Sequence, residues 1–559
     1  MLRIAPVVTL LLLILPIAAG LAGTVLPSFG YLPALGGTEF SLGPWRDLLA
    51  YPGFGSALRL SIVTGVAATM LSFAIAVLTC ATFHGAPGFR RLQAAIAPIL
   101  AMPHSALAIG FAFLIAPSGW LARLAASVTG ADRPGDIVTV QDEGGLALIA
   151  GLLLKEVPYL LLMIFAALNQ MPARQAMAIA RSLGYGAALA WIKVVLPRIY
   201  PQIRLPIYAV LAFSLSVVDV ALILGPGNPP PLGPLALRWF SDPLLLLYFP
   251  AAAAACLQLA LLVAAIALWR TGEVVVARAG RWWIARGGRG LAVQPFLNAA
   301  GRIAWLLLAL SALSLLAMGL WSVAESWRFP DLLPTGWTLA TWTRQAAGLW
   351  WPVQTTMALA LVSTLIAMVL ALACLENEQR RGLHPGIGAL WLLYTPLLVP
   401  QIAFLFGAQI VLIRLDLDGT WTALVWSHLL FVLPYVFLSL ADPWRNIDPR
   451  LIRTAACLGA SPLRILFAVK LPMMLRPLLA AAAVGFAVSV GLYLPTLFAG
   501  NGRFATLTTE AVTLAGGADR RIIGIHALLQ ALLPLLIYAI ALAAPSIAFR
   551  HRRLLAVAS

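Results

Sequence analysis

Long apolar runs occupy most of this sequence. A helix needs about 20 consecutive, mainly apolar residues to cross the hydrocarbon of a bilayer, and the chain contains twelve runs of about this length. They lie at approximately 7–26, 56–83, 94–118, 145–168, 204–226, 244–269, 303–324, 353–375, 387–413, 421–441, 477–499 and 526–549. Only 10% of the residues are charged, which excludes a water-soluble globular protein. Because lipid offers no partners to backbone groups, we predict an all-α polytopic membrane protein with twelve transmembrane helices.

The formal net charge of +17 is distributed unevenly along the chain. If the N-terminus is cytoplasmic, the cytoplasmic segments hold most of the lysines and arginines and few acids. The outer segments then hold slightly more acids than bases. This is the asymmetry that membrane proteins show, so the charge predicts cytoplasmic termini and argues against a nucleic-acid partner. The first run, which follows Arg3 and contains Ala18-Ala19-Gly20, resembles a leader, but we interpret it as a retained helix because an even number of spans requires it.

The chain divides into two similar halves, 1–269 and 303–559, with six runs in each. Both halves contain a proline followed seven residues later by glycine, and both carry Pro-Tyr in the fourth run. The matched residues are Met102-Pro103 and Gly110 with Val399-Pro400 and Gly407, and Pro158-Tyr159 with Pro434-Tyr435. Proline kinks a helix. Paired kinks in corresponding helices predict a pathway at the interface of the halves.

Residues 270–302 join the two halves and contain six arginines against a single acid, Glu273. The segment includes Gly-Gly-Arg-Gly at 287–290 and has no long apolar run. We interpret it as a cytoplasmic linker that lies against anionic lipid headgroups, where the Trp282-Trp283 pair would sit at the interface. A solvated connector is an equally compatible interpretation.

A short basic motif occurs once in each half, between the fourth and fifth runs. In both copies Ala lies four residues before Gly, Leu lies one before it, and Leu-Pro follows twelve and thirteen residues after it. The copies are Ala180, Leu183, Gly184, Leu196 and Pro197, and Ala455, Leu458, Gly459, Leu471 and Pro472. Helix-favouring residues before a glycine predict a helix, a turn and a second short helix. We call the segments 172–203 and 449–476 the first and second elbow.

The elbows carry Arg181 and Arg453, which could pair with acids on a partner. An ordinary cytoplasmic loop, duplicated with the rest of the chain, is the alternative. The motif resembles the EAA loop in permease subunits of binding-protein-dependent ABC importers with the type I (MetI-like) fold. Two such domains in one chain resemble ferric-iron and thiamine permeases, and Ser214 to Asp219 and Tyr493 to Thr496 resemble the thiamine-type branch most closely. The leading Glu of the family is replaced by Ala178 and Arg453.

This resemblance implies a permease subunit in a bacterial inner membrane that transports a small cationic solute such as thiamine or ferric iron. It implies that the elbows dock on two copies of a separate ATPase and that a periplasmic solute-binding protein delivers the substrate. The chain has three lysines, Lys155, Lys193 and Lys470, and none follows glycine, so no phosphate-binding loop exists. The four cysteines lack metal-ligand spacing. We therefore predict no enzyme activity, no cofactor and no metal site.

Charged residues inside the apolar runs are candidates for the translocation path. Lys155, Glu156 and Asp219 lie within spans of the first half, and His428 is the nearest ionisable group in the second. A buried charge in a membrane costs at least about 2.5–3.5 kcal/mol, so it faces protein or a water-filled cavity. Asp219 is a candidate partner for Lys155. A polar path lining and an interhelical ion pair are both compatible with the pattern, and two acids against one base favour a cationic substrate.

The outer loops carry Asp132, Asp136, Asp142 and Glu143 and a proline-rich run at 225–231, which could meet a soluble binding protein or merely be solvated. The main rival to an ABC permease is a twelve-helix secondary transporter driven by an ion gradient. It would explain the span count and the intramembrane acids. It would not explain two matched elbows at corresponding places.

Overall fold

The computed structural model describes residues 3–85, 88–289, 292–383 and 386–548. Gly290 of the linker and residue 549 at the end of the last predicted run lie outside the described residues. The described part is almost entirely helical, and its one sheet is the antiparallel pair β1 (Ala324–Ser326) and β2 (Gly336–Trp337). The predicted all-α polytopic fold is confirmed.

The first half contains the following helices and helical turns: α1 (Ala5–Ser28), η1 (Pro33–Leu35), α2 (Gly43–Ala50), α3 (Phe54–Phe83), α4 (Gly88–Ala101), α5 (His104–Ile115), α6 (Trp120–Thr129), α7 (Leu146–Leu168), α8 (Ala173–Ser182), α9 (Ala187–Ala190), η2 (Trp191–Val195), α10 (Leu196–Ser216), α11 (Asp219–Leu224), α12 (Leu232–Phe240), η3 (Leu245–Leu247) and α13 (Tyr248–Ala285). The six predicted runs of this half fall on α1, α3, α4 with α5, α7, α10 with α11, and η3 with α13. The linker adds α14 (Gln294–Gly301).

The second half contains α15 (Ile303–Val323), α16 (Ala340–Arg381), α17 (Ile387–Leu398), α18 (Gln401–Arg414), α19 (Trp421–Arg445), α20 (Pro449–Cys457), α21 (Pro462–Ile465), η4 (Leu466–Lys470), α22 (Leu471–Met473), α23 (Leu475–Val490), α24 (Leu494–Gly500), α25 (Leu507–Ala515) and α26 (Arg520–Ala548). The helices break at Pro103 and at Pro400, where a proline follows an apolar residue in both halves. By contrast, α7 and α19 continue through Pro158 and Pro434.

By length and composition, nine helical segments of the described chain could cross a membrane, or up to eleven if two sharply bent pairs each form one span. One of these pairs bends by 93° between Leu398 and Gln401. The predicted run 204–226 is the one outside this count, and it falls on α10 and α11, which are separated by Val217 and Val218. Each of the twelve predicted runs thus coincides with a helix or a broken helix, and twelve crossings stay a prediction.

The first helix of each half packs against the other half. Helix α1 lies along α18, and α15 lies along α5 and α26. Glycines permit both close approaches: a Cβ on Gly23 would lie 2.8 Å from Gly407, and a Cβ on Gly110 would lie 2.6 Å from the carbonyl oxygen of Ser314. The glycines that match between the halves, Gly110 and Gly407, therefore both sit where a helix from the opposite half crosses.

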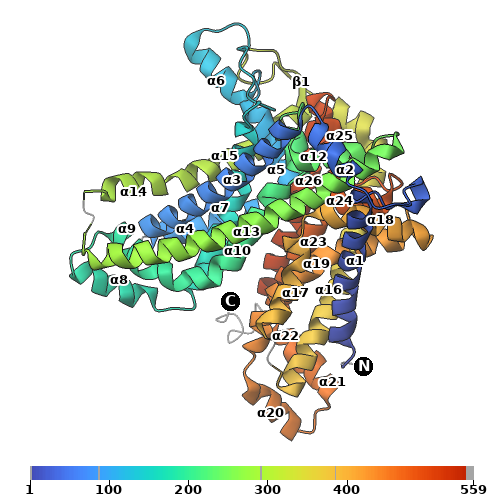
Figure 1. The fold of residues 1–559 in the computed structure, drawn as a ribbon. Coiled ribbons are helices and arrows are strands. Elements are labelled where there is room, and N and C mark those ends of the chain that lie inside the picture. The colour runs from blue at the N-terminus through green and yellow to red at the C-terminus, as the bar shows by residue number, and fades with distance from the viewer. Residues whose placement is uncertain (1–2, 86–87, 290–291, 384–385, 549–559) are drawn as a thin grey trace.

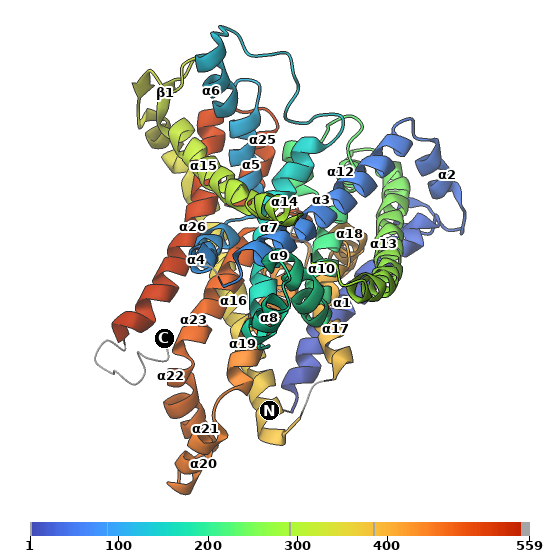
Figure 2. The same cartoon turned by 90° about the vertical axis from the view of Figure 1, so that its left-hand side faces the viewer.

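Apart from α1 and α15, each of which lies with the opposite half, the two halves diverge into two arms (Figure 1). The segments α6, α12, α25 and β1 gather at the end where the arms meet, and the elbows lie at the far ends, with α8 on one arm and α20 on the other (Figures 1 and 2). Helix α13 runs along the first arm and continues well past the predicted span 244–269, so residues 270–285 of the linker are helical. The helix ends just before Gly287-Gly288, where helix propensity is low.

Candidate functional site

The two elbows share one backbone turn. In the first elbow the Tyr185 amide donates to the Ala180 carbonyl (3.3 Å) and the Gly184 amide to Arg181 (3.0 Å). In the second, Ala460 donates to Ala455 (3.1 Å) and Gly459 to Ala456 (3.0 Å). These bonds form a Schellman motif, which needs a left-handed residue after the helix. The φ angles of Gly184 and Gly459 are 82° and 79°, so both glycines occupy that position.

A five-residue π-helical turn leads from each elbow back into the helix bundle. The turns are η2 and η4, and each ends immediately before Leu-Pro. Pro197 and Pro472 cannot donate a backbone hydrogen bond, and π-helical turns, which are rare, occur mostly as single turns inserted in α-helices. Each copy of the motif thus contains a π-helical turn as well as a Schellman turn.

The predicted docking residues divide into an outward and an inward face. Leu183 is 60% exposed and Leu458 is 82% exposed, and both lie beside glycine at the tip of an elbow. The exposed set also includes Arg181, Pro197, Arg453 and Pro472, whereas Ala180 is buried and Leu196, Ala455 and Leu471 are half-buried. Each tip therefore presents an apolar residue and an arginine outward. That these residues contact an ATPase stays a prediction.

The linker packs against the first elbow. The Gly186 amide donates to the Arg289 carbonyl (3.2 Å), and the Ala188 amide donates to Oε1 of Gln294 (3.1 Å). The buried Lys193 in η2 donates to the Gly288 carbonyl (2.8 Å). A hollow of about 330 Å³ lies beside these contacts and is lined by α8 residues together with Tyr185, Lys193, Arg198 and the linker residue Ile284.

An ion cluster holds the second elbow instead. The buried Lys470 in η4 contacts Glu376 of α16 at 2.6 Å and Oε1 of Gln379 at 2.7 Å. Arg380 contacts the other oxygen of Glu376 at 2.6 Å. A second pair, Arg445 with Glu378 at 2.7 Å, lies nearby on α19 and α16. The sequence signal for this cluster was an acid at the end of an apolar run, one residue beyond the predicted span 353–375.

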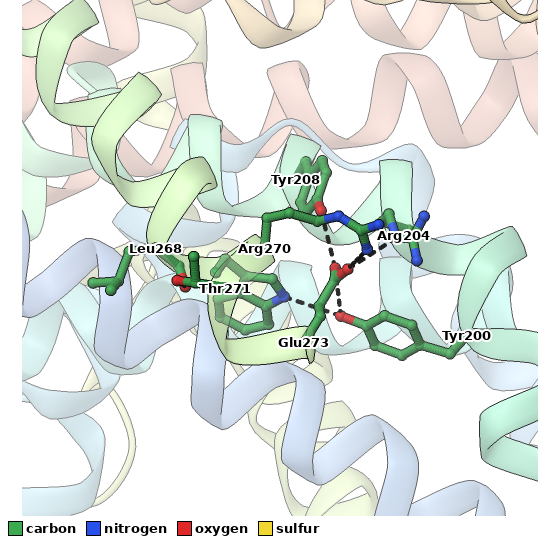
Figure 3. Close-up of polar contacts among 8 residues, drawn as sticks. Tyr200, Arg204, Tyr208, Leu268, Arg270, Thr271 and Glu273 are labelled. Carbon is green, nitrogen blue, oxygen red and sulfur yellow. Dashed lines mark hydrogen bonds and ion pairs between the residues drawn. The ribbon is translucent and has the colours of Figure 1, made fainter. Parts of the chain in front are cut away.

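Glu273, the single acid of the linker, joins α13 to α10 (Figure 3). One carboxylate oxygen accepts hydrogen bonds from Tyr200 and Tyr208, both at 2.9 Å. The other pairs with Arg204 at 3.1 Å and with Arg270. Because α10 begins at the first elbow and α13 leads into the linker, this cluster ties together the two helices that flank that elbow.

Lys155 does not pair with Asp219, contrary to our expectation. Its Nζ donates to the carbonyls of Ile99 (3.0 Å), Leu100 (2.8 Å) and Met102, where α4 ends and α5 has not begun. A helix C-terminus exposes carbonyls without partners and carries partial negative charge. A buried ammonium is therefore satisfied by the helix break that Pro103 creates.

A histidine that the sequence did not single out, His104, interacts with both Glu156 and Asp219. Nε2 of His104, the first residue of α5, lies 3.4 Å from Oε1 of the buried Glu156. Asp219, the first residue of α11, interacts electrostatically with His104 and with Tyr493 of the second half. The position of His104 directly after the matched Met-Pro pair was the signal that could have identified it.

Three tyrosines complete this polar group. Tyr159 and Tyr435, from the matched Pro-Tyr pairs, interact electrostatically with each other and with Glu156. Tyr394 interacts with both of these tyrosines. All three rings are half-buried. Tyrosines of α7 in the first half and of α17 and α19 in the second thus interact electrostatically, and Tyr159 and Tyr435 also interact with Glu156.

His428 is a packing residue rather than part of this group. It is 1% exposed, and its ring nitrogens lie 2.8 Å from the Ser489 hydroxyl and 2.9 Å from the Thr496 hydroxyl. It ties α19 to α23 and α24. Our prediction that it lines the path finds no support in this placement. Among the described residues, no group of three or more His, Cys, Asp or Glu side chains could hold a metal ion.

Comparison with known proteins identifies the class. No family model matches the chain. It belongs to the ABC transporter permeases, because it is 35% identical over 515 residues, 89% of its length, to a permease of this family. That relative is the inner membrane ABC transporter permease protein YnjC of Escherichia coli (strain K12), of which the match covers 90%.

Shorter matches extend the comparison. The spermidine/putrescine transport system permease protein PotC homolog of Mycoplasma genitalium is 27% identical over 159 residues, 28% of this chain and 55% of that protein. The PotC protein of Escherichia coli (strain K12) is 27% identical over 128 residues, 23% of this chain and 47% of that protein. The predicted ABC permease class is therefore confirmed, and the relatives are transport permeases rather than enzymes. The comparisons do not single out the thiamine or ferric-iron branch.

Proposed function

We propose that this chain forms the whole translocation pathway of an ABC importer in a bacterial inner membrane, with halves 1–269 and 303–559 acting as internal repeats. The observation that carries the proposal is the pair of elbows. Each has the same Schellman turn and the same π-helical turn, and each stands at the end of one arm (Figure 1). Two equivalent docking sites suit two copies of a separate ATPase.

The elbows transmit force because each continues directly into membrane helices. ATP binding closes the ATPase pair, and closure brings the two arm ends together. The exposed tips at Leu183 and Leu458, with Arg181 and Arg453 beside them, are the docking surfaces. Because Ala178 and Arg453 replace the acidic residue of the family loop, docking rests on shape and on arginines that meet acids of the ATPase.

The polar group between the halves lies on a route across the membrane. A hollow of about 320 Å³ is lined by Pro226, Arg238 and Tyr493. Tyr493 connects it electrostatically to Asp219, and His104 connects Asp219 to Glu156. The hollow is the outer mouth of this route, and the diverging arms open toward the elbows on the cytoplasmic side.

The substrate is a small cationic solute. Two acids, Glu156 and Asp219, and three half-buried tyrosines surround the route, and carboxylates and aromatic faces both attract cations. The PotC relatives are named for spermidine and putrescine, which are organic cations. Thiamine is also an organic cation with this chemistry. Ferric iron, which the resemblance to iron permeases implied, would use the carboxylates but not the aromatic faces.

A periplasmic binding protein would deliver this solute to the outer end. The proline-rich run 225–231 borders the outer hollow and forms part of that docking surface. Asp142 has a structural role, because its carboxylate accepts from the Leu146 and Ala147 amides at the start of α7, both at 2.8 Å. Asp132, Asp136 and Glu143 are exposed.

The test of the proposed function is the double variant Gly184→Asp, Gly459→Asp, reconstituted with its ATPase in proteoliposomes. An aspartate at each left-handed position distorts both Schellman turns. It also adds a carboxylate to each elbow, whose arginines, Arg181 and Arg453, should meet acids of the ATPase. We expect the protein to reach the membrane and ATP-dependent uptake to be lost. Unchanged uptake would overturn the docking proposal. Uptake that persists in ATP-depleted vesicles under an ion gradient would favour the secondary transporter instead.

A further inference from the structure

A buried lysine lies in the π-helical turn of each elbow, and the two lysines have different partners. Lys470 is 3% exposed and is paired with a carboxylate, as described above. Lys193 is 6% exposed, and its described partners are the Gly288 carbonyl and the rings of Trp283, at 4.5 Å, and Tyr185, at 5.3 Å. A buried ammonium is costly unless its donors are satisfied. The linker therefore satisfies the buried ammonium group of Lys193, as a carboxylate does for Lys470 in the second elbow.

The same linker residues also complete the turn of the first elbow. The amides of Gly186 and Ala188 begin α9, and the first amides of a helix have no partner within it. Arg289 and Gln294 accept from these two amides. In the second elbow the cap comes from within, because the Ser461 hydroxyl accepts from Arg464 at the start of α21. The first elbow thus depends on a segment about 100 residues further along the chain.

These contacts close a ring of three elements. Helix α10 starts at the elbow, the Glu273 cluster binds α10 to α13 (Figure 3), and the end of α13 returns to the elbow through Trp283 and Gly288. Ring-like bracing makes the elbow, α10 and α13 move together, because a displacement of any one member strains contacts to both others. The second elbow is held differently: Lys470 contacts Glu376 and Gln379 of α16 and lies over the Trp444 ring of α19 at 5.6 Å.

We propose that the linker residues Trp283 to Arg289 and Gln294 are a positioning element of the first elbow, which couples movement of that elbow to α10 and α13. The proposal rests on the proposed function, since it assumes that an ATPase moves the elbow. It assigns to the linker a role beyond joining the halves or touching lipid. Lys193 and Gln294 are positioning residues, because they act on the docking tip through the linker and through α9.

The experiment measures coupling separately from docking. Lys193→Met keeps the length of the side chain and removes its donors, and Lys193→Arg keeps a cation that can donate to Gly288 and stack on Trp283. Each variant is reconstituted with the ATPase, and three quantities are measured: the ATPase that co-purifies, the rate of ATP hydrolysis, and solute transported per ATP. We expect Lys193→Met to bind the ATPase as the wild type does and to transport about tenfold less solute per ATP. Lys193→Arg should restore most of the loss.

A second pair of variants keeps the test decisive if Lys193→Met fails to fold. Gln294→Leu removes the acceptor for the Ala188 amide, and Gln294→Glu keeps it. The leucine variant should lose coupling and the glutamate variant should retain it. Arg278→Met, at an exposed position of α13 in the same linker, is the matched control and should transport normally.

The outcomes separate the two proposals. A wild-type chain that captures no ATPase would overturn the proposed function itself. Wild-type coupling in Lys193→Met and Gln294→Leu, with the ATPase bound, would overturn only the positioning role. Equal losses of ATPase binding in the disruptive and the conservative variants would show a general folding role and would also overturn it.

Discussion

The two elbows have the same local backbone and different anchors. In each, a short helix ends in a Schellman turn at glycine and a π-helical turn precedes Leu-Pro. The first elbow is held by linker carbonyls, an amide side chain and aromatic rings, whereas the second is held by Glu376, Arg380 and Lys470. Local sequence therefore sets the shape of an elbow, and the surrounding helices set how firmly and to what it is attached.

The backbone turns of the two elbows match, but the partners of their buried charges do not. Both π-helical turns bury one lysine, at the third position of η2 and at the fifth of η4. The positions differ by two residues, so the two ammonium groups point to different neighbours. One reaches the linker, which exists only between the halves, and the other reaches the end of α16.

The largest expected effect is on the second elbow alone. Glu376→Gln leaves Lys470 buried without a carboxylate, and breaking a buried ion pair in this way costs about 3–5 kcal/mol. The first elbow has no equivalent pair in its described contacts. The thermal unfolding midpoint of the purified permease should fall clearly, and hydrogen exchange should increase in peptides that cover 462–474.

The control for this prediction is Glu378→Gln. It removes the partner of Arg445, whose side chain is 34% exposed, so solvent screening limits the cost to about 1 kcal/mol or less. Equal losses of stability in the two variants would show that the buried cluster does not hold the second elbow as proposed.

An intermediate effect should be shared by both elbows. Gly184→Ala and Gly459→Ala force a Cβ into a left-handed backbone, which costs roughly 1–2 kcal/mol. A Cβ on Gly184 would meet Arg289 only at 3.4 Å, and one on Gly459 would meet nothing within 4 Å, so crowding adds little at either site. Hydrogen exchange of the peptides 173–186 and 449–461 should accelerate by similar factors. A response confined to one elbow would contradict the view that the turns are set locally.

The smallest effect is a pH dependence of the first elbow. His84 lies just beyond α3, and burial, then the neighbouring Arg174, lowers its pKa. The neutral imidazole is thus favoured in the folded protein, so its contribution to stability is present above the unfolded pKa of about 6.5 and is lost as the pH falls through the lowered folded pKa. Exchange at 173–182, corrected for intrinsic rates, should rise at pH 5.5.

The second elbow is the internal control for this pH effect, and His84→Gln should abolish it. An equal pH response at 449–457, or a response that survives the substitution, would count against His84 as its source.

The sequence located the membrane helices well because a span is a local property of length and hydrophobicity. Helix α15 begins at the first residue of its predicted run, and α7 and α19 begin within one residue of theirs. The elbows were also predictable, since a Schellman turn depends on a few consecutive residues and on glycine after them. The linker was not: its first part is a continuation of α13, because the single glycines Gly272 and Gly280 do not end the helix and no proline occurs in the linker before Gly287-Gly288.

Partners of buried charges could not be predicted. Lys155 was matched to Asp219, the acid inside a span other than the adjacent Glu156, yet it binds backbone carbonyls that are free only because α4 breaks at Pro103. His104 was missed because a single histidine carries little signal until Glu156 and Asp219 are placed around it. The Pro-Tyr pairs were noticed for their prolines, whereas their tyrosines are what meet at the interface.

The sequence by itself determined the all-helical membrane fold, the place of both elbows and their turns, because these depend on hydrophobic length and on local backbone preference. Tertiary structure alone decided which group satisfies each buried lysine, which residues from the two halves surround Glu156, and that the linker braces one elbow. The physical reason is that a buried charge must be satisfied by whatever donor or acceptor the packing brings to it. Those groups lie tens to hundreds of residues away, where neither spacing nor periodicity carries information about them.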